Sequence, residues 1–458
     1  MQKGGLGLIK VCETGFIKKE KTMKKFVTAI VLLSILCCTM VFAQGQKEAE
    51  TTGPKDVTLK VYARAYTYQQ DDPWKNAEKK LQDAHPELNI SFEYEGFGWA
   101  DLRTKFLTAS AGGEAPDVVM TDIIWVGEYA EGNLIADVTE KAEAWSEWKD
   151  VAPLYKEATK VDGRIYGTWL NTDVRVMAYN KKLFKAAGLD PETPPRTWSE
   201  LKAAAKQISD KLAPASYGLG FPATLEDETA QTFYAYLFSL GGKILSDDNK
   251  TALFNSEEGI RALSELVEMV QIGATPTSIV AGSSSDINNG VFQDKFAMSY
   301  MTKAFGLAKD LIPGLTAEQY LEEFGVATIP YADGGNASTM SGGYLLCVPT
   351  GSRNQDLAWE FIEYAAGAES QFGYTAARGY VPTFTSLMER ASDYYEIDPY
   401  FSVILEQLNN AHFRPSIPQY TEIAAEVQNA VQAAIMGVKT PKQALDDAAK
   451  IVNQLLNE

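Results

Sequence analysis

The stretch from residue 162 to residue 212 constrains the fold more than any other part of this chain. It opens with an Asp-Gly turn, and residues 174–178 alternate apolar with more polar side chains as a strand does. Asn180 then suits the N-cap of a helix, and Gly188 suits its left-handed C-terminal position. Prolines in the following loop forbid continuation of that helix. Thr197 precedes a glutamate by three residues, the spacing of a capping box, so a second helix is predicted there.

The same residues resemble the family 1 extracellular solute-binding proteins, the maltose-binding-protein-like sugar-binding subunits of bacterial ABC importers. The usual run in that family is a D-G-x-x-Y-G turn, a strand ending in Y-N-K, an L-F-x-x-A-G-L helix and a P-x-T-W-x-E-L helix start. This chain has each of these in order between residues 162 and 201. With further landmarks, among them the run at residues 109–118, the resemblance covers about residues 57–457.

The resemblance implies an α/β architecture with two lobes, the type II periplasmic-binding-protein fold, in which the ligand cleft lies between the lobes and several hinge crossings join them. A chain of 458 residues is long enough for two lobes with full cores. We expect the crossings near Asn171, Gly342 and Ala411, which are the predicted hinge residues. Lobe one is predicted to comprise residues 57–172 with 344–410, and lobe two residues 173–343 with 411–458.

The N-terminus has the pattern of a cleavable export signal. Two lysines precede an apolar run that ends with small residues suited to cleavage, Val41 and Ala43. Residues 1–43 are therefore predicted to be a signal peptide and residues 44–56 a polar linker, and Met23 fits the start of such a signal better than the first residue does. A permanent membrane anchor is the alternative, because the run approaches membrane-spanning length. The small-residue site favours cleavage, and hence a periplasmic or other extracytoplasmic location.

Charge and cysteine content bear on partners. The formal net charge is -18, and the leader holds more lysine than glutamate, so the mature part is still more acidic. This balance argues against nucleic acid and against an anionic membrane surface, and it is compatible with a neutral solute. With two histidines in the chain, no metal site is expected, and no cofactor either. Cys37 and Cys38 lack the small residue that precedes a lipidated cysteine, so no lipid anchor is expected; Cys347 is predicted to be a buried thiol.

Aromatic and acidic residues follow the first three predicted strands. Sugars are recognised by flat aromatic faces and by planar polar groups, which collect at the carboxyl ends of strands. The candidates are Tyr66 after the first strand, Trp99 after the second, and Asp122 and Trp125 after the third. The alternative is that these aromatic rings seal the end of a core.

The first crossing and lobe two supply the remaining ligand-binding candidates. In related sugar binders an acidic residue at the position of Asp173 reaches the ligand, which makes Asp173 the leading candidate. Its alternative role is an exposed carboxylate or a hydrogen-bonding group at the hinge. Gly343 lets backbone approach either a ligand or a neighbouring strand. The other candidates are Trp169, Gln231, Lys303, Tyr344, Arg378 and Arg414.

The leading functional hypothesis is an exported, non-enzymatic receptor. It would capture a small-molecule carbohydrate in the cleft by hinge closure and deliver it to the transmembrane permease subunits of an ABC importer, acting as a monomer. One alternative keeps the fold and changes the solute to a polyol, a peptide or a small anion. Another is a secreted glycan-cleaving enzyme that uses Asp122 and Asp173. No nucleophile elbow or metal motif in the sequence supports that enzyme.

Overall fold

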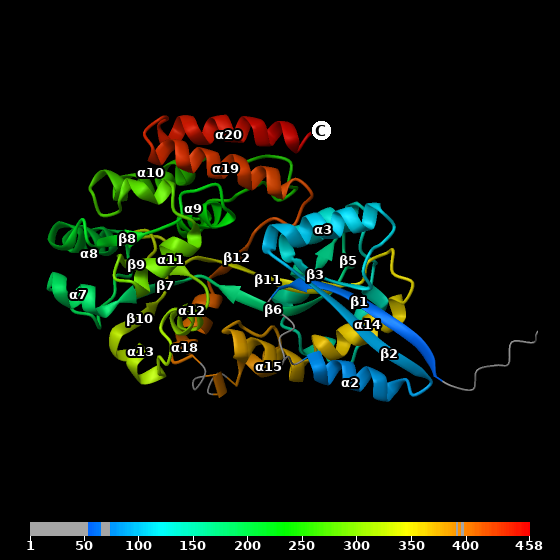
Figure 1. Cartoon of the computed structure of the whole chain (residues 1–458). Coiled ribbons are helices and arrows are strands. Elements are labelled where there is room, and N and C mark those ends of the chain that lie inside the picture. Colours follow the sequence, from blue (N-terminus) through cyan, green and yellow to red (C-terminus); the bar gives the residue numbers. More distant parts are fainter. Residues whose placement is uncertain (1–53, 66–73, 391–392, 395–397) are drawn as a thin grey trace, which may run out of the picture. The chain divides into compact units, whose positions relative to one another are not determined.

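Two β-sheets, joined by chain segments that pass between them, organise the protein (Figure 1). The computed structural model describes residues 54–65, 74–390, 393–394 and 398–458. The predicted signal peptide, most of the linker and Tyr66 lie outside the described residues. Residues 56–458 form one compact unit.

The first sheet has the order β12-β11-β3-β1-β2, and a sixth strand, β6, also pairs with β11. β1 and β3 are parallel, β11 and β12 are parallel, and β11 is antiparallel to both β3 and β6. All nine residues of β11 are buried, including Cys347, so the predicted burial of that thiol is confirmed. The strands are β1 (Lys55–Arg64), β2 (Leu88–Phe97), β3 (Val118–Asp122), β6 (Thr168–Val174), β11 (Thr339–Cys347) and β12 (Ala411–Phe413).

Helices cover the first sheet on both sides. In Figure 1, α2 and α14 lie below β1 and β2, and α3 lies above them. The predicted Asp-Gly turn joins the short strands β4 and β5. The elements are α2 (Trp74–Ala84), α3 (Trp99–Ala111), η1 (Ile123–Trp125), α4 (Val126–Glu131), α5 (Thr139–Ala144), η2 (Trp148–Asp150), α6 (Pro153–Ala158), β4 (Lys160–Val161), β5 (Arg164–Ile165), α14 (Gln355–Ala365), α15 (Ala368–Arg378) and α16 (Thr385–Met388).

The second sheet has the order β10-β7-β9-β8, in which β8 and β9 are parallel and the other pairs antiparallel. The C-terminal helices α19 and α20 pack together against α9 and α10 (Figure 1). The elements are β7 (Val176–Asn180), α7 (Lys181–Ala187), α8 (Trp198–Leu212), β8 (Tyr217–Gly220), α9 (Asp227–Ser239), α10 (Glu257–Gln271), η3 (Thr277–Val280), α11 (Ser284–Phe292), β9 (Phe296–Met301), α12 (Ala304–Leu311), α13 (Ala317–Glu323), β10 (Phe324–Ala327), α18 (Phe401–Leu408), α19 (Tyr420–Ile435) and α20 (Pro441–Leu455).

The local predictions around α7 and α8 are confirmed. The Asn180 side chain accepts a hydrogen bond from the Leu183 amide at 3.1 Å, and Gly188 has a left-handed φ of 73°. Thr197 forms the predicted capping box at the start of α8. One detail differs: the alternating run at residues 174–178 is two strands, because β6 ends at Val174 in the first sheet and β7 begins at Val176 in the second.

The three predicted crossings fall on neighbouring strands. Gly342 of β11 pairs with Asp173 of β6, and Thr339 of β11 pairs with Ala411 of β12. The segments that hold the predicted hinge residues therefore lie side by side in one hydrogen-bonded layer. Their action as a hinge stays a prediction.

The predicted lobe boundaries also stay a prediction. Residues 400–408 fall in the range predicted for lobe one, but Tyr400 at their start contacts elements beside the second sheet. The Tyr400 hydroxyl donates to the Phe324 carbonyl at 3.0 Å, and its ring contacts Tyr320. These contacts are with β10 and α13, next to the second sheet.

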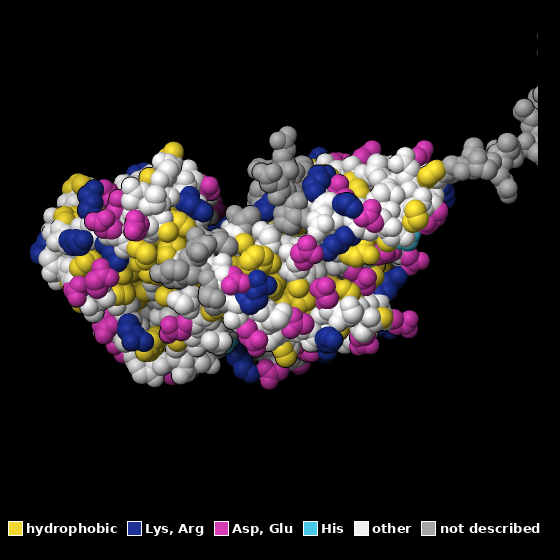
Figure 2. Space-filling view, turned by 90° about the horizontal axis from the view of Figure 1, so that it is seen from below, with side chains coloured by type: hydrophobic (Ala, Val, Ile, Leu, Met, Phe, Trp, Pro, Cys, Tyr) yellow, Lys and Arg dark blue, Asp and Glu magenta, His cyan; other side chains and the backbone are white. Residues whose placement is uncertain are grey.

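Surface charge is mixed on the face shown in Figure 2. Acidic and basic side chains are interspersed there, with apolar side chains between them. The negative net charge of the chain is therefore not concentrated in one acidic region of that face.

Gly343 occupies a position in β11 that excludes a side chain. Its φ is 136°, which L-residues rarely adopt, and a Cβ would lie 2.3 Å from the Asn171 carbonyl oxygen and 3.0 Å from the Trp169 ring. Just after Gly343 in the sequence, the pairing of β11 with β6 has a register shift between Tyr344 and Leu345. The close approach that glycine permits here is to the neighbouring strand β6.

We expect Gly343→Ala to lower the free energy of unfolding by about 3 kcal/mol or more, because the variant combines backbone strain with a steric clash. Denaturant unfolding followed by circular dichroism measures this. Gly113→Ala is the matched control, since Gly113 has a φ of 75° with no atom within 4 Å of the added Cβ. The control should lose only about 1–2 kcal/mol; equal losses for the two variants would contradict the clash.

Candidate functional site

Arg414 connects two carboxylates that come from different parts of the fold. It follows β12, and its side chain is 3% exposed. Its Nη2 donates to Oδ1 of Asp122, the last residue of β3, at 3.2 Å, and its Nη1 donates to Oδ2 of Asp227, the first residue of α9. A buried cation is stable only when it is paired and hydrogen-bonded, so this triad fixes the end of β3 relative to the start of α9.

Asp122 lies between Arg414 and two tryptophans. The Trp99 indole Nε1 donates to Asp122 Oδ2 at 3.0 Å, and the rings of Trp99 and Trp125 are 4.9 Å apart. Burial raises the pKa of Asp122, whereas the Arg414 charge and the Trp99 hydrogen bond oppose that change. The structure thus brings together three of the predicted residues from the carboxyl ends of β2 and β3. Trp99 is half-buried and Trp125 is 1% exposed.

Asp227 is held by groups from two helices. The Tyr420 hydroxyl at the start of α19 donates to Asp227 Oδ1 at 2.9 Å, and the Gln231 side chain donates through Nε2 to Oδ2. Asp227 also lies in the first turn of α9, where the helix dipole favours a negative charge. Sequence reasoning missed Asp227. The available signal was the acidic run at residues 226–228 before an apolar helix.

Asp173 forms an ion pair with Arg175, two residues along the chain, and also bonds to the neighbouring strand. Its Oδ1 accepts from Arg175 Nη1 at 2.6 Å and from the Gly342 amide at 3.1 Å, so it ties β6 to β11. This geometry matches the hydrogen-bonding role at the crossing that was the alternative for Asp173. Gly342 also leaves room for Arg414, because a Cβ there would lie 2.8 Å from Arg414 Nη2.

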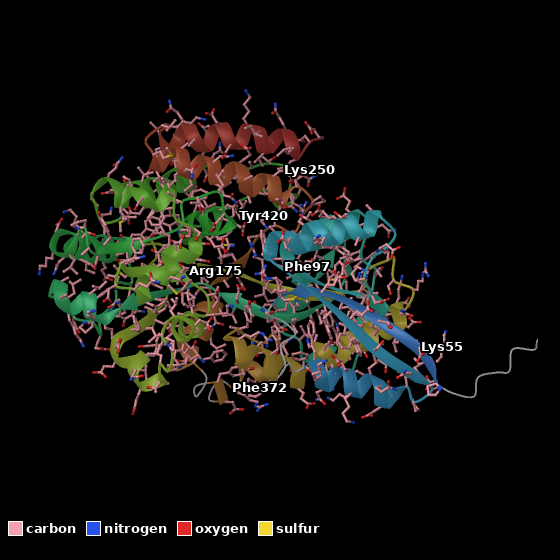
Figure 3. The ribbon with its side chains drawn as sticks, in the orientation of Figure 1. Lys55, Phe97, Arg175, Lys250, Phe372 and Tyr420 are labelled. Carbon is pink, nitrogen blue, oxygen red and sulfur yellow. The ribbon has the colours of Figure 1, made fainter. Side chains whose placement is uncertain are left out.

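A small pocket lies next to this network, between α9 and the carboxyl end of β9. Its volume is about 70 Å³. Figure 3 labels Arg175 beside the strands that connect the two sheets, and Tyr420 at the start of α19 above it. Gln231 is the predicted site residue in this pocket. The polar side chains that line it include Arg175, Glu228, Gln231, Thr232, Asn288 and Thr302.

Lys303 and Arg378 form a separate cluster of cations over aromatic rings. The Lys303 ammonium lies 4.5 Å from the centre of the Tyr380 ring, and the Arg378 guanidinium lies 4.5 Å from the centre of the Tyr374 ring. Lys303 adopts a left-handed φ of 53° at the N-cap of α12, and Arg378 ends α15. Lys303 at the start of α12 and Arg378 at the end of α15 were predicted separately, and they lie over two tyrosine rings whose centroids are 6.0 Å apart.

Trp169, Gly343 and Tyr344 are part of the packed layer of connecting strands. Trp169 is 0% exposed, its Nε1 donates to the Tyr155 carbonyl at 2.9 Å, and its ring contacts Phe413. Tyr344 is buried in β11, opposite Asp122. Trp169 therefore has the surroundings of a core residue, and contact of Trp169, Gly343 or Tyr344 with a solute stays a prediction.

Sequence reasoning also missed Arg175, Glu228 and Asn288. Arg175 was taken for a polar position of one continuous strand, which hid its place between two sheets. Glu228 and Asn288 lie on helices whose pattern shows only that they are not core residues. Among the described residues, no group of three or more histidine, cysteine, aspartate or glutamate side chains could hold a metal ion.

Comparison with known proteins gives consistent matches. A model of the bacterial extracellular solute-binding protein family matches residues 67–372. The sn-glycerol-3-phosphate-binding periplasmic protein UgpB of Salmonella paratyphi A is 26% identical over 322 residues, which are 67% of this chain and 70% of that protein.

Solved structures agree with the sequence matches. An ABC transporter solute-binding protein from Thermotoga lettingae TMO, bound with alpha-D-tagatose, has a TM-score of 0.76 at 28% identity, covering 88% of this chain and 100% of that chain. The cyclic alpha-maltosyl-1,6-maltose binding protein from Arthrobacter globiformis has a TM-score of 0.72 at 25% identity, covering 88% and 99%.

We expect Arg414→Met to lower the free energy of unfolding at pH 7.5 by about 3–5 kcal/mol, because it leaves Asp122 and Asp227 buried without their cation. The loss should shrink toward pH 5.5. Without the cation, the raised pKa of Asp122 rises further, and protonation then stabilises the folded variant as the pH falls. Denaturant titrations at both pH values measure the difference.

Arg164→Met is the control for Arg414→Met. Arg164 pairs with Asp137 at 3.6 Å on the surface, so its removal should change stability by less than about 1 kcal/mol at either pH. A loss for Arg414→Met as small as that of the control, or one independent of pH, would show that the triad does not stabilise the fold.

Proposed function

Because this chain belongs to the bacterial extracellular solute-binding proteins, we propose that it captures a carbohydrate or polyol for an ABC importer. The observation that carries the proposal is the family match over residues 67–372, together with a polar pocket beside a buried charge network. The prediction of a two-lobed α/β periplasmic-binding-protein fold is confirmed by the solved structures that this chain resembles.

The names of the relatives support a solute with several hydroxyl groups. The Thermotoga lettingae protein is bound with a sugar, the Arthrobacter globiformis protein is named for a cyclic maltose derivative, and UgpB is named for a phosphorylated polyol. Neighbouring hydroxyls need side chains that donate and accept in pairs. The arginine, carboxylate and amide groups around Arg175 and Gln231 have this character.

A binding role fits the carboxylates better than catalysis does. The family and fold are those of binding proteins. The two carboxylates considered for an enzyme, Asp122 and Asp173, are each paired with an arginine. A glycosidase needs one carboxyl group free to protonate a leaving group and another placed at a set distance from it. We therefore propose that this chain is not an enzyme.

We propose that the solute lies where the two lobes meet and that contacts to both lobes favour a closed arrangement. Trp99, Asp122 and Trp125 would contribute from the first sheet, and Gln231 from α9. Lys303 and Arg378 would contribute from the start of α12 and the end of α15. Asn171, Gly342 and Ala411 would act as the hinge.

The partners of this receptor are proposed by the same reasoning. A binding protein of an ABC importer delivers its solute to transmembrane permease subunits, outside the cytoplasm. The sequence pattern at residues 1–43 supports export by a signal peptide. No helix among the described residues is long and apolar enough to cross a membrane. We propose a monomer that does not bind nucleic acid, in keeping with the net charge of -18.

Thermal-shift screening of the exported protein against sugars, polyols, amino acids and anions tests the proposal. A true solute at 100 times its Kd should stabilise the folded state by about 2.7 kcal/mol. Chromatography of the incubated hit should recover it unchanged. Stabilisation by amino acids or inorganic anions alone would contradict the solute class, and appearance of a hydrolysis product would contradict the binding role.

Asp173→Ala tests the leading predicted ligand contact. We expect it to weaken binding of the hit by on the order of ten-fold or more in calorimetry, as removal of a charged hydrogen-bond partner does. Asp101→Ala, an exposed position on α3, is the control and should leave the Kd unchanged. A loss of stability with unchanged Kd would assign Asp173 to the link between β6 and β11 alone.

A further inference from the structure

The pocket between α9 and β9 has room for one end of a solute. Its volume is about 70 Å³. At roughly 10–15 Å³ for each water-sized group, this space accepts a few such groups. The hydroxyl-bearing end of a sugar or polyol has that size.

Gln231 lines this pocket and has a hydrogen-bond acceptor without a partner. Its side-chain Nε2 donates to Oδ2 of Asp227. The Gln231 Oε1 is buried and has no hydrogen-bond partner among the described residues. Leaving a buried acceptor unpaired is unfavourable, so a donor such as a hydroxyl group is the complementary partner.

The pocket is lined by both donors and acceptors. Glu228 lines it one residue beyond Asp227; burial and then the Asp227 charge raise the pKa of Glu228, whereas Arg175 lowers it. Asn288 accepts from Ser299 through Oδ1, which leaves its amide group as a donor. A hydroxyl group both donates and accepts, so two adjacent hydroxyls match this arrangement.

The charges around the pocket disfavour an anion. Carboxylates outnumber arginines in the connected network, and both arginines are already engaged, Arg175 by Asp173 and Arg414 by two aspartates. A phosphate monoester would bring a charge of about -1.5 to -2 next to Glu228. Both arginines of this network are already paired with carboxylates, so neither is available to pair with the phosphate.

We propose that this pocket receives an uncharged end of the solute that carries two adjacent hydroxyls, that Glu228 and Gln231 accept from them, and that the network excludes phosphorylated solutes. The inference rests on the proposed function and narrows its substrate class. It separates this chain from UgpB, whose name specifies sn-glycerol 3-phosphate.

Calorimetry with paired solutes tests the exclusion. The exported protein is titrated with D-tagatose, ribitol, maltose and glycerol, and with a phosphate monoester of each. We expect at least one neutral compound to bind, and its phosphate ester to bind more weakly by on the order of 100-fold, as like charges are juxtaposed. A phosphate ester that binds as tightly as its parent would overturn the inference and leave the proposed function standing. Binding of neither member of any pair would overturn both.

Glu228→Gln tests the acceptor role with little change in shape. We expect the neutral hit to bind on the order of ten-fold more weakly, and the difference in Kd between this compound and its phosphate ester to become smaller. Glu257→Gln, at an exposed position of α10, is the control with the same change in net charge and should alter neither Kd. Melting temperatures verify that both variants fold. Unchanged binding by Glu228→Gln would show that Glu228 does not contact the solute. If this variant does not fold, the paired titration of the unmodified protein still decides whether phosphorylated solutes are excluded.

Discussion

The buried guanidinium of Arg414 sets a condition that the surrounding structure has to meet. A cation without water is tolerated only with good partners, so Asp122 and Asp227 have to arrive at the same place although β3 and α9 are far apart in the sequence. Other features serve the same requirement. Gly342 lacks the Cβ that would collide with Arg414, and Tyr420 orients Asp227 through a hydrogen bond. The charge network thus depends on correct formation of both sheets.

The connecting strands explain why several predicted ligand contacts lie inside the molecule. β11 pairs with β3, β6 and β12, and all nine of its residues are buried. Trp169 lies in that layer against Tyr155 and Phe413. An aromatic residue next to a crossing was an attractive candidate because crossings adjoin the cleft in this fold. The sequence contains no signal for which side of the layer the ring occupies.

Local features were predictable and tertiary ones were not. The caps at Asn180 and Thr197 follow from a few adjacent residues, and the structure confirms them. The family resemblance supplied the two-lobed fold. By contrast, Arg414 meets Asp122 and Asp227 at sequence separations of 292 and 187 residues. Such pairs depend on the fold as a whole, so residue type and spacing alone could not identify them.

The side-by-side arrangement of β6, β11 and β12 has a mechanical consequence. A single flexible linker leaves two bodies free to translate and rotate, and binding between them then costs the entropy of all those motions. Three strands held by hydrogen bonds in one layer resist shear and separation, and leave bending of the layer as the soft deformation. Most of the entropy of relative lobe motion would then be lost during folding, so closing around a solute would cost little more.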